Sequence, residues 1–463
     1  MTAVASEFVV RSRRVVVDEQ TRPAAVHIRS GTVVGVTDFE DVPGGCPIDE
    51  AGDAVVMPGV VDTHVHVNEP GRTGWEGFDT ATRAAAAGGV TTIVDMPLNS
   101  IPATTSAAAL EAKRRAAEGQ CFVDVGFWGG VVPGNASELP GLAAAGALGF
   151  KCFLVPSGVD EFEAVTEADL RIALPVLARL GVPLLVHAEL PGPIEKASRQ
   201  LAAPIAGASG DAPDPRRYAT YLATRPTQAE NDAIALSIAL CREYGVRTHI
   251  VHLSSAAALP LLIDAFASHC PITVETCPHY LTFAAGDIAD GATAFKCAPP
   301  IRERENRESL WAALAGGRIQ MVASDHSPSP PALKQLGSGN FLTAWGGISS
   351  LQISLAATWT GASARGWSLT QLAGWLCRAP SRLAGLERKG AIEVGRDADL
   401  VVWDPEREFT VAGRSLLHRH ALTPYEGGVL RGVVERTYLR GQRIYQRGQP
   451  MRAPAGRFLT RSG

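Results

Sequence analysis

The chain has 463 residues, enough for one large α/β barrel with an appended domain or for roughly two to four average domains. Its formal net charge is −4, from 43 basic and 47 acidic residues, and no long run of one sign occurs. This balance does not favour a nucleic-acid or membrane partner, so a small neutral or anionic metabolite is the expected partner.

The N-terminus and the cysteines indicate a reducing, intracellular setting. Residues 1–8 lack the basic region and long apolar stretch of a secretory signal, and no later segment offers an uninterrupted apolar stretch that could cross a bilayer. The eight cysteines show no CxxC spacing, in a chain large enough to need no disulfide bonds for stability. We therefore expect a cytoplasmic protein with free thiols.

Short strand patterns occupy both ends of the chain. Residues 8–58 contain alternating β-branched runs, with a tight turn at Ser30 and Gly31 between two of them. Residues 391–403 and 433–445 repeat this style. Strands at both termini, around a different middle, predict that the two ends meet and pair into one small β-sandwich.

The middle of the chain alternates apolar strands with Ala/Leu-rich helices, as a parallel barrel requires. The predicted fold class is therefore α/β, with a (β/α)8 TIM-like barrel over 58–390 and a sandwich divided between 1–57 and 391–463. The expected barrel strands, apolar throughout because both faces are buried, are 60–66, 91–95, 122–127, 149–154, 183–187, 248–252, 271–275 and 319–324. The expected helices include 80–87, 106–118, 167–180, 228–244, 256–267 and 307–315.

Two longer polar segments interrupt this alternation. One covers 192–226 after the fifth strand, and it is rich in proline and glycine; the other begins at Ser327 after the eighth strand and runs to Asn340. Long loops at the C-terminal ends of barrel strands carry substrate-binding groups, so both segments are expected beside the site.

A pair of histidines closes the first barrel strand. His64 and His66 are separated by one residue, and positions i and i+2 of a strand point to the same face. Two imidazoles placed in this way can bind one cation. Taken alone, the pair also fits two histidines that lie on the surface or find their hydrogen-bond partners in the core.

Further candidate ligands close or lie within later strands, on the face where barrel active sites form. Four imidazoles, one lysine and one carboxylate occur in strand order, and such a set favours a borderline divalent cation, with Zn²⁺ as the first choice. The six residues are His64, His66, Lys151, His187, His252 and Asp325.

Lys151 needs its own explanation, because an ammonium group has no lone pair and repels cations. Desolvation beside metals lowers the pKa of a lysine, and the neutral amine can add carbon dioxide to become a carbamate with two oxygens. Carboxylated Lys151 would then bridge two metal ions. The alternative for an isolated buried lysine is an ion pair with a nearby carboxylate.

At this point the sequence resembles the binuclear branch of the amidohydrolase superfamily, the cyclic amidases that include dihydroorotases, dihydropyrimidinases and allantoinases. The resemblance runs from the N-terminal strands through PGVVDTHVH at 58–66 to GRDADL at 395–400. It implies that His64 and His66 bind one metal, that Lys151 bridges, and that His187 and His252 bind the second. It also implies that Asp325 binds the first metal and acts as the base.

Several stretches are similar to allantoinases in particular, at positions that are not ligands. They are NEPGR at 68–72, WEGF at 75–78, DMPLNS at 95–100, GFKCFL at 149–154, SGVDEF at 157–162, ETCPHYL at 275–281 and WGGISSLQ at 345–352. Dihydroorotases carry an arginine where this chain has Asn68, so their bidentate carboxylate partner is missing. Dihydropyrimidinases carry a tyrosine where this chain has Pro156.

The resemblance implies hydrolysis of allantoin to allantoate. Asp325 would take the proton of the attacking water and deliver it to the leaving ring nitrogen. The family pattern nominates Asn99, Ala298, Ser327 and Gly346 as substrate contacts, and it implies a homotetramer. For Asn99 and Ser327 the alternatives are a turn residue and a serine that caps its own backbone.

Other functions remain open at this stage. The nearest alternative is a dihydropyrimidinase or hydantoinase that uses the same metals on another ring. A non-catalytic scaffold is disfavoured by the complete set of six ligands, and a mononuclear deaminase would have no use for Lys151.

Overall fold

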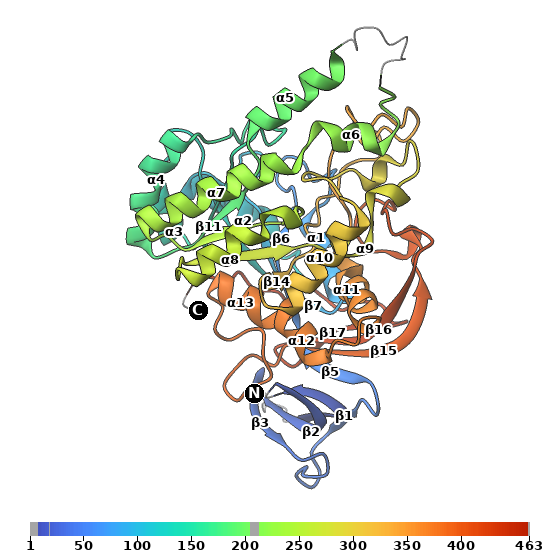
Figure 1. Ribbon diagram of the computed structural model, residues 1–463. Helices are drawn as coiled ribbons and strands as arrows, with labels where there is room; N and C mark the ends of the chain where they lie inside the picture. Colours follow the sequence, from blue (N-terminus) through green and yellow to red (C-terminus); the bar gives the residue numbers. More distant parts are fainter. Residues whose placement is uncertain (1–7, 18, 204–212, 462–463) are drawn as a thin grey trace.

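The computed structural model describes residues 8–17, 19–203 and 213–461 (Figure 1). The predicted terminal segments include 1–7, 18 and 462–463, and the polar segment predicted after the fifth strand includes 204–212. These residues lie outside the described ones.

Parallel strands occupy all eight segments predicted to form them, with ends that differ by up to a few residues. They form two sheets, one of three strands in the order β6-β7-β8 and one in the order β14-β13-β12-β11-β10-β9. Their side chains are almost all buried, as the apolar runs predicted. The strands are β6 Val60–Val65, β7 Val90–Asp95, β8 Asp124–Phe127, β9 Gly129–Gly130, β10 Phe150–Phe153, β11 Leu184–His187, β12 Thr248–Ile250, β13 Ile272–Thr276 and β14 Met321–Val322.

The first strand lies beside the chain that leaves the last one. Val65 in β6 forms a parallel bridge with His326, and the N–H of His66 donates to the His326 carbonyl at 2.8 Å. This contact brings the predicted ligands of the first strand next to Asp325.

Helices follow the strands, and the six predicted segments are all helical. The boundaries of these helices have local causes: Thr166 caps α4 by accepting from the Asp169 N–H, and the helix ends at Gly181 in a left-handed conformation.

No helix in the described part of the chain is long and apolar enough to cross a bilayer. The α-helices outside the segment after β11 are α1 Phe78–Ala87, α2 Ala107–Ala117, α3 Leu139–Ala144, α4 Glu167–Leu180, α7 Thr227–Tyr244, α8 Leu259–Ala267, α9 Pro278–Thr282, α10 Arg304–Ala315, α11 Ser354–Ser363, α12 Leu369–Ala373 and α13 Ala379–Ala384.

The segment after β11 differs from the predicted loop, because it contains α5 (Pro191–Ala202) and α6 (Tyr218–Thr224). Pro191 and Pro193 stand in the first turn of α5, where a missing N–H costs no helical hydrogen bond. Side chains of α5 at helical spacing, Ile194, Ser198, Leu201 and Ala202, line the cavity at the ends of the parallel strands. The density of proline and glycine concealed this pattern.

The two ends of the chain pair in one sheet, at the lower part of the molecule in Figure 1. β5 lies between strands from opposite ends: it pairs parallel to β1 and antiparallel to β15, with Val56 opposite Val402. The strands are β1 Phe8–Val17, β2 Gln20–Arg29, β3 Thr32–Thr37, β4 Ile48–Glu50, β5 Val55–Pro58, β15 Leu400–Thr410, β16 Val429–Leu439 and β17 Gln442–Gln446.

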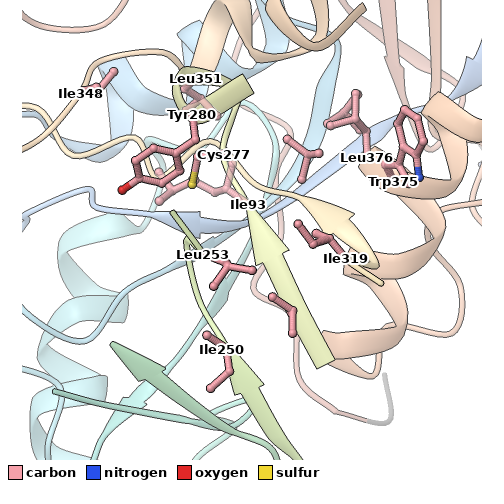
Figure 2. Packing of buried hydrophobic residues seen from close by; sticks show 14 of the residues in the cluster. Ile93, Ile250, Leu253, Cys277, Tyr280, Ile319, Ile348, Leu351, Trp375 and Leu376 are labelled. Atoms are coloured by element: carbon pink, nitrogen blue, oxygen red, sulfur yellow. The ribbon is translucent and has the colours of Figure 1, made fainter. Parts of the chain in front are cut away.

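The largest buried apolar cluster joins the parallel strands to the surrounding helices (Figure 2). Ile93 from β7 and Ile250 from β12 belong to it, together with Trp375 from the helical segment 374–378 and Leu351. Close packing of this kind fixes the strand ends, where the candidate site residues lie.

Candidate metal centre and active site

One cavity of about 600 Å³ contains every residue predicted for the site. It lies where β6, β10, β11 and β12 end, with α5 and α6 on its wall. Its lining includes the six predicted ligands and the four predicted substrate contacts, namely His64, His66, Lys151, His187, His252, Asp325, Asn99, Ala298, Ser327 and Gly346.

Three of the predicted ligands surround one point. Nε2 of His64 lies 3.3 Å from Oδ1 of Asp325, and Nε2 of His66 lies 3.5 Å from the same oxygen. One ligand atom from each residue lies within 4.8 Å of the others. All three side chains are buried, so this group is suited to hold a divalent cation away from bulk water.

The other three predicted ligands continue from this group. Nζ of Lys151 lies 3.1 Å from Nε2 of His64, and the His252 ring lies 5.4 Å from the His64 ring. The rings of His187 and His252 are 4.6 Å apart in a T-shaped arrangement. Lys151 therefore lies against the first group, and His252 connects that group to His187.

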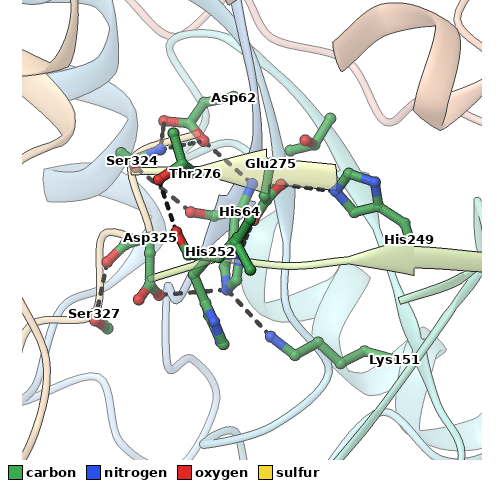
Figure 3. A network of polar contacts seen from close by, with 12 residues as sticks. Asp62, His64, Lys151, His249, His252, Glu275, Thr276, Ser324, Asp325 and Ser327 are labelled. Atoms are coloured by element: carbon green, nitrogen blue, oxygen red, sulfur yellow. Dashed lines mark hydrogen bonds and ion pairs between the residues drawn. The ribbon is translucent and has the colours of Figure 1, made fainter. Parts of the chain in front are cut away.

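Two of these residues have unusual backbone conformations. Asp325 has φ of 44° and His252 has φ of 41°, in the left-handed region that non-glycine residues rarely occupy. Asp62 holds the neighbouring backbone, since its carboxylate accepts from the His64 N–H at 3.1 Å and from the Ser324 N–H at 3.2 Å (Figure 3). Residues strained in this way persist where the surroundings fix them, which is common at functional sites.

Glu275 lies behind the first group and was not predicted as part of the site. Its Oε1 accepts from Nδ1 of His64 at 2.5 Å, and its Oε2 lies 3.1 Å from Nε2 of His249 (Figure 3). Because a carboxylate only accepts, this contact places the proton of His64 on Nδ1 and leaves Nε2 free to act as a ligand.

Glu189 holds His187 in a similar way. Its Oε2 accepts from Nε2 of His187 at 2.9 Å and from the Arg225 guanidinium at 2.6 Å. Burial opposes ionisation of Glu189, but the charge of Arg225 and the hydrogen bond from His187 outweigh it and lower its pKa to about 2. Glu189 was likewise missed by the sequence analysis, although it follows His187 by two residues.

Burial also changes the protonation of the ligands themselves. It lowers the pKa of Lys151 to about 8, and it lowers the pKa of His66 and His187 below the usual range. Burial alone would raise the pKa of Asp325, but the hydrogen bond from His66 and nearby positive charge lower it instead. The protein thus favours neutral imidazoles and an ionised carboxylate, which are the forms that bind metals.

The donor set therefore fits a metal centre. Nδ1 of His252 is buried and has no hydrogen-bond partner within the described part of the chain. Each unpartnered buried nitrogen costs about 1–3 kcal/mol, a penalty that a group bound in the cavity can offset.

The predicted substrate contacts occupy another part of the wall. Oδ1 of Asn99 is buried without a partner among the described residues, while Oγ of Ser327 donates to the Asp325 carbonyl at 2.9 Å. Pro156 also lines the cavity, whereas Asn68 is buried outside its lining. Asn99 thus offers a free acceptor, and Ser327 supports the backbone of Asp325.

Known proteins resemble the chain along nearly its whole length. The sequence profile of the amidohydrolase family matches residues 55–444. The chain is 50% identical to an allantoinase from Streptomyces avermitilis, over 98% of this chain and 99% of that protein. It is 42% identical to an allantoinase from Saccharomyces cerevisiae, over 98% of each.

Solved structures also resemble the chain along nearly its whole length, at lower sequence identity. An L-hydantoinase (dihydropyrimidinase) from Arthrobacter aurescens superposes with a TM-score of 0.90 at 31% identity, covering 98% of this chain and 100% of that chain. A dihydropyrimidinase from Brevibacillus agri gives a TM-score of 0.87 at 28% identity, covering 98% and 99%.

Proposed function

Because the chain belongs to the amidohydrolase family, we propose that it is an allantoinase, an enzyme that opens the ring of allantoin by hydrolysis to give allantoate. The observation that carries this proposal is the near full-length similarity to allantoinases, at 50% identity with the relative from Streptomyces avermitilis. The cavity that contains all six candidate ligands supports a metal-dependent hydrolase.

The proposed cofactor is a pair of divalent cations, Zn²⁺ by the chemistry of the ligands. His64, His66 and Asp325 would hold one ion, and His187 and His252 the other. Lys151 would bridge the two as a carbamate, formed when its neutral amine adds carbon dioxide and releases a proton. The lowered pKa of Lys151, about 8, supports a substantial neutral fraction near physiological pH.

When bound, such ions supply positive charge that polarises the amide carbonyl and acidifies the attacking water. Asp325 is the proposed catalytic residue: its carboxylate takes the proton of the water and then delivers it to the ring nitrogen as the carbon–nitrogen bond breaks. Asp62, which holds the Ser324 N–H at 3.2 Å, keeps the backbone beside Asp325 in place.

The proposed substrate contacts are Asn99, Ser327 and the backbone at Ala298 and Gly346, all on the cavity wall. The unpartnered Oδ1 of Asn99 would accept from a substrate N–H. Allantoin, a hydantoin with a ureido substituent, offers several such donors.

We also propose that the two parallel sheets form one closed (β/α)8 barrel over 58–390. The bridge between Val65 and His326 supports closure. The proposed sandwich consists of 1–57 and 391–463, which is supported by the pairing of β5 with β15. A homotetramer is the proposed assembly.

The experiment that tests the function compares ring opening of allantoin, hydantoin, dihydrouracil and dihydroorotate at equal metal loading, with the metal content measured on the same samples. We expect allantoin to have the highest kcat/KM. Faster turnover of hydantoin would favour the hydantoinase alternative, and faster turnover of dihydroorotate would refute the allantoinase assignment; both would leave a cyclic amidase.

A further inference from the structure

Lys296 is a buried cation in the wall of the cavity. It follows the 3₁₀ turn η3 (Thr293–Phe295), lines the cavity and is 9% exposed. Its Nζ donates to the carbonyls of Leu342 at 3.2 Å and Ala344 at 2.5 Å, and it lies 5.0 Å from the centre of the Tyr221 ring.

The donors of this ammonium group are not fully used. A lysine has three N–H donors, and two of those of Lys296 go to backbone carbonyls. No carboxylate among the described residues pairs with it. Burial, and secondarily the charge of Arg225, lower the pKa of Lys296 to about 8. A buried cation with a spare donor is stabilised by an oxygen acceptor from a ligand.

Lys296 makes no direct polar contact with the candidate metal ligands among the described residues. Its backbone carbonyl accepts from the Gly347 N–H at 2.8 Å, and the residues of its two carbonyl partners, Leu342 and Ala344, line the cavity themselves. Lys296 therefore belongs to a wall where a ring substituent could be held.

We infer that Lys296 is a specificity-determining residue, whose third N–H donates to the carbonyl oxygen of the ureido substituent of allantoin. The inference rests on the proposed function, because it assigns one end of that substrate to one residue. A hydantoin ring without the substituent cannot make this contact.

Lys334 offers a matched control. It is buried like Lys296 and donates to the backbone carbonyls of Lys296, at 3.3 Å, and Gly347. Lys334 does not line the cavity. Both lysines therefore hold the same chain segment, but only Lys296 can reach a ligand.

The test uses the metal-loaded, full-length enzyme with Lys296→Met and Lys334→Met. The measured quantities are the KM for allantoin and the inhibition constant of hydantoin against allantoin turnover. For Lys296→Met we expect the KM to rise about 10- to 100-fold, the range for a hydrogen bond to a charged group. The inhibition constant of hydantoin should change by less than about threefold, which is less than the loss of one such hydrogen bond would cause. Lys334→Met should change both constants by similar factors.

Equal changes of both constants in Lys296→Met would overturn the inference, because they would show that Lys296 only holds the segment. If that variant does not fold, Lys296→Gln, which keeps a polar but uncharged and shorter side chain, should give a smaller change with the same selectivity for allantoin. Hydantoin-5-acetic acid serves as a third probe: a larger loss of its affinity than of that of allantoin would assign Lys296 to an anionic substituent and refute the ureido contact. Absence of allantoin turnover in the unmodified enzyme would instead refute the proposed function.

Discussion

Glu275 and His64, which are 211 positions apart in the sequence, are joined by a 2.5 Å hydrogen bond from Nδ1 of the imidazole to Oε1 of the carboxylate. Both side chains are fully buried. The contact fixes the ring of a candidate metal ligand and determines which nitrogen faces the cavity.

Glu275→Gln is expected to weaken metal binding about 10- to 100-fold, the usual effect of losing a carboxylate that orients a ligating histidine. The amide keeps the volume of the side chain but can no longer offer an acceptor oxygen at both positions, to His64 and to His249. Metal affinity is measured by competition with a chelator. A matched variant, Glu76→Gln, removes a buried carboxylate that contacts His326 instead; equal metal loss in both variants would contradict the assigned role.

Lys151→Ala is expected to lower the metal content below two ions per chain and to abolish nearly all turnover. The methyl group of alanine cannot form a carbamate, and neither Phe150 nor Cys152, its neighbours along the strand, provides two oxygens. Elemental analysis after gel filtration measures the metal. The neighbouring Cys152 is buried in the apolar core, so Cys152→Ala serves as the control that keeps both ions. Two tightly bound ions in the Lys151 variant would exclude the bridging role.

Asp325→Asn is expected to lower kcat by about 100- to 10,000-fold, the usual contribution of a general acid–base group. The amide can neither accept the proton of the water nor return it. Steady-state kinetics at matched metal content measure the effect. A loss below about tenfold would move the base elsewhere. His326 is a poor substitute, because Nδ1 accepts from the Ser350 N–H and Nε2 contacts Glu76.

The sequence predicted the parts of the fold that depend on local pattern. Eight apolar runs became strands because residues buried on both faces leave a signal that needs no knowledge of contacts. The helix α5 was missed because Pro191 and Pro193 resemble a loop when they are counted rather than placed in a first turn. The spacing of Ile194, Ser198 and Leu201 carried the helical signal.

In the candidate site, too, the residues with a local sequence signal could be predicted, whereas those defined by distant contacts could not. His64 and His66 could be found from their period of two, and Asp325 from its place at a strand end. Glu275 and Arg225 could not be assigned, because their roles depend on contacts with His64 and Glu189 that are distant in sequence. Asn68, which stands where dihydroorotases carry an arginine, is buried outside the lining of the cavity, and its orientation could not be read from the sequence either.

The last prediction concerns the joint between the parallel strands and the terminal segments. Lys389 is 3% exposed, and its Nζ lies 2.6 Å from Asp124 at the start of β8, 2.7 Å from Asp399 and 2.9 Å from Asp397. The surrounding carboxylates outweigh burial and raise the pKa of Lys389, so it stays charged. Lys389→Met would leave the buried Asp399 without a side-chain cation, since the side chain of Arg440 reaches Asp124 and that of Arg388 reaches Asp397.

We expect Lys389→Met to lower the free energy of unfolding by about 3–5 kcal/mol, the cost of removing one partner from a buried ion pair. Arg13→Met is the matched control, because Arg13 pairs with Asp53 on the surface, with side chains 60% and 78% exposed; its loss should cost less than about 1 kcal/mol. Urea denaturation followed by tryptophan fluorescence compares the two variants with the unmodified protein. If Lys389→Met unfolds at the same urea concentration as Arg13→Met, the buried cation does not hold the terminal segments to the strands. If Lys389→Met unfolds at a lower urea concentration and its folded fraction keeps the full metal content, Lys389 stabilises the fold. It then plays no part in metal binding, which stays with the six candidate ligands of the cavity.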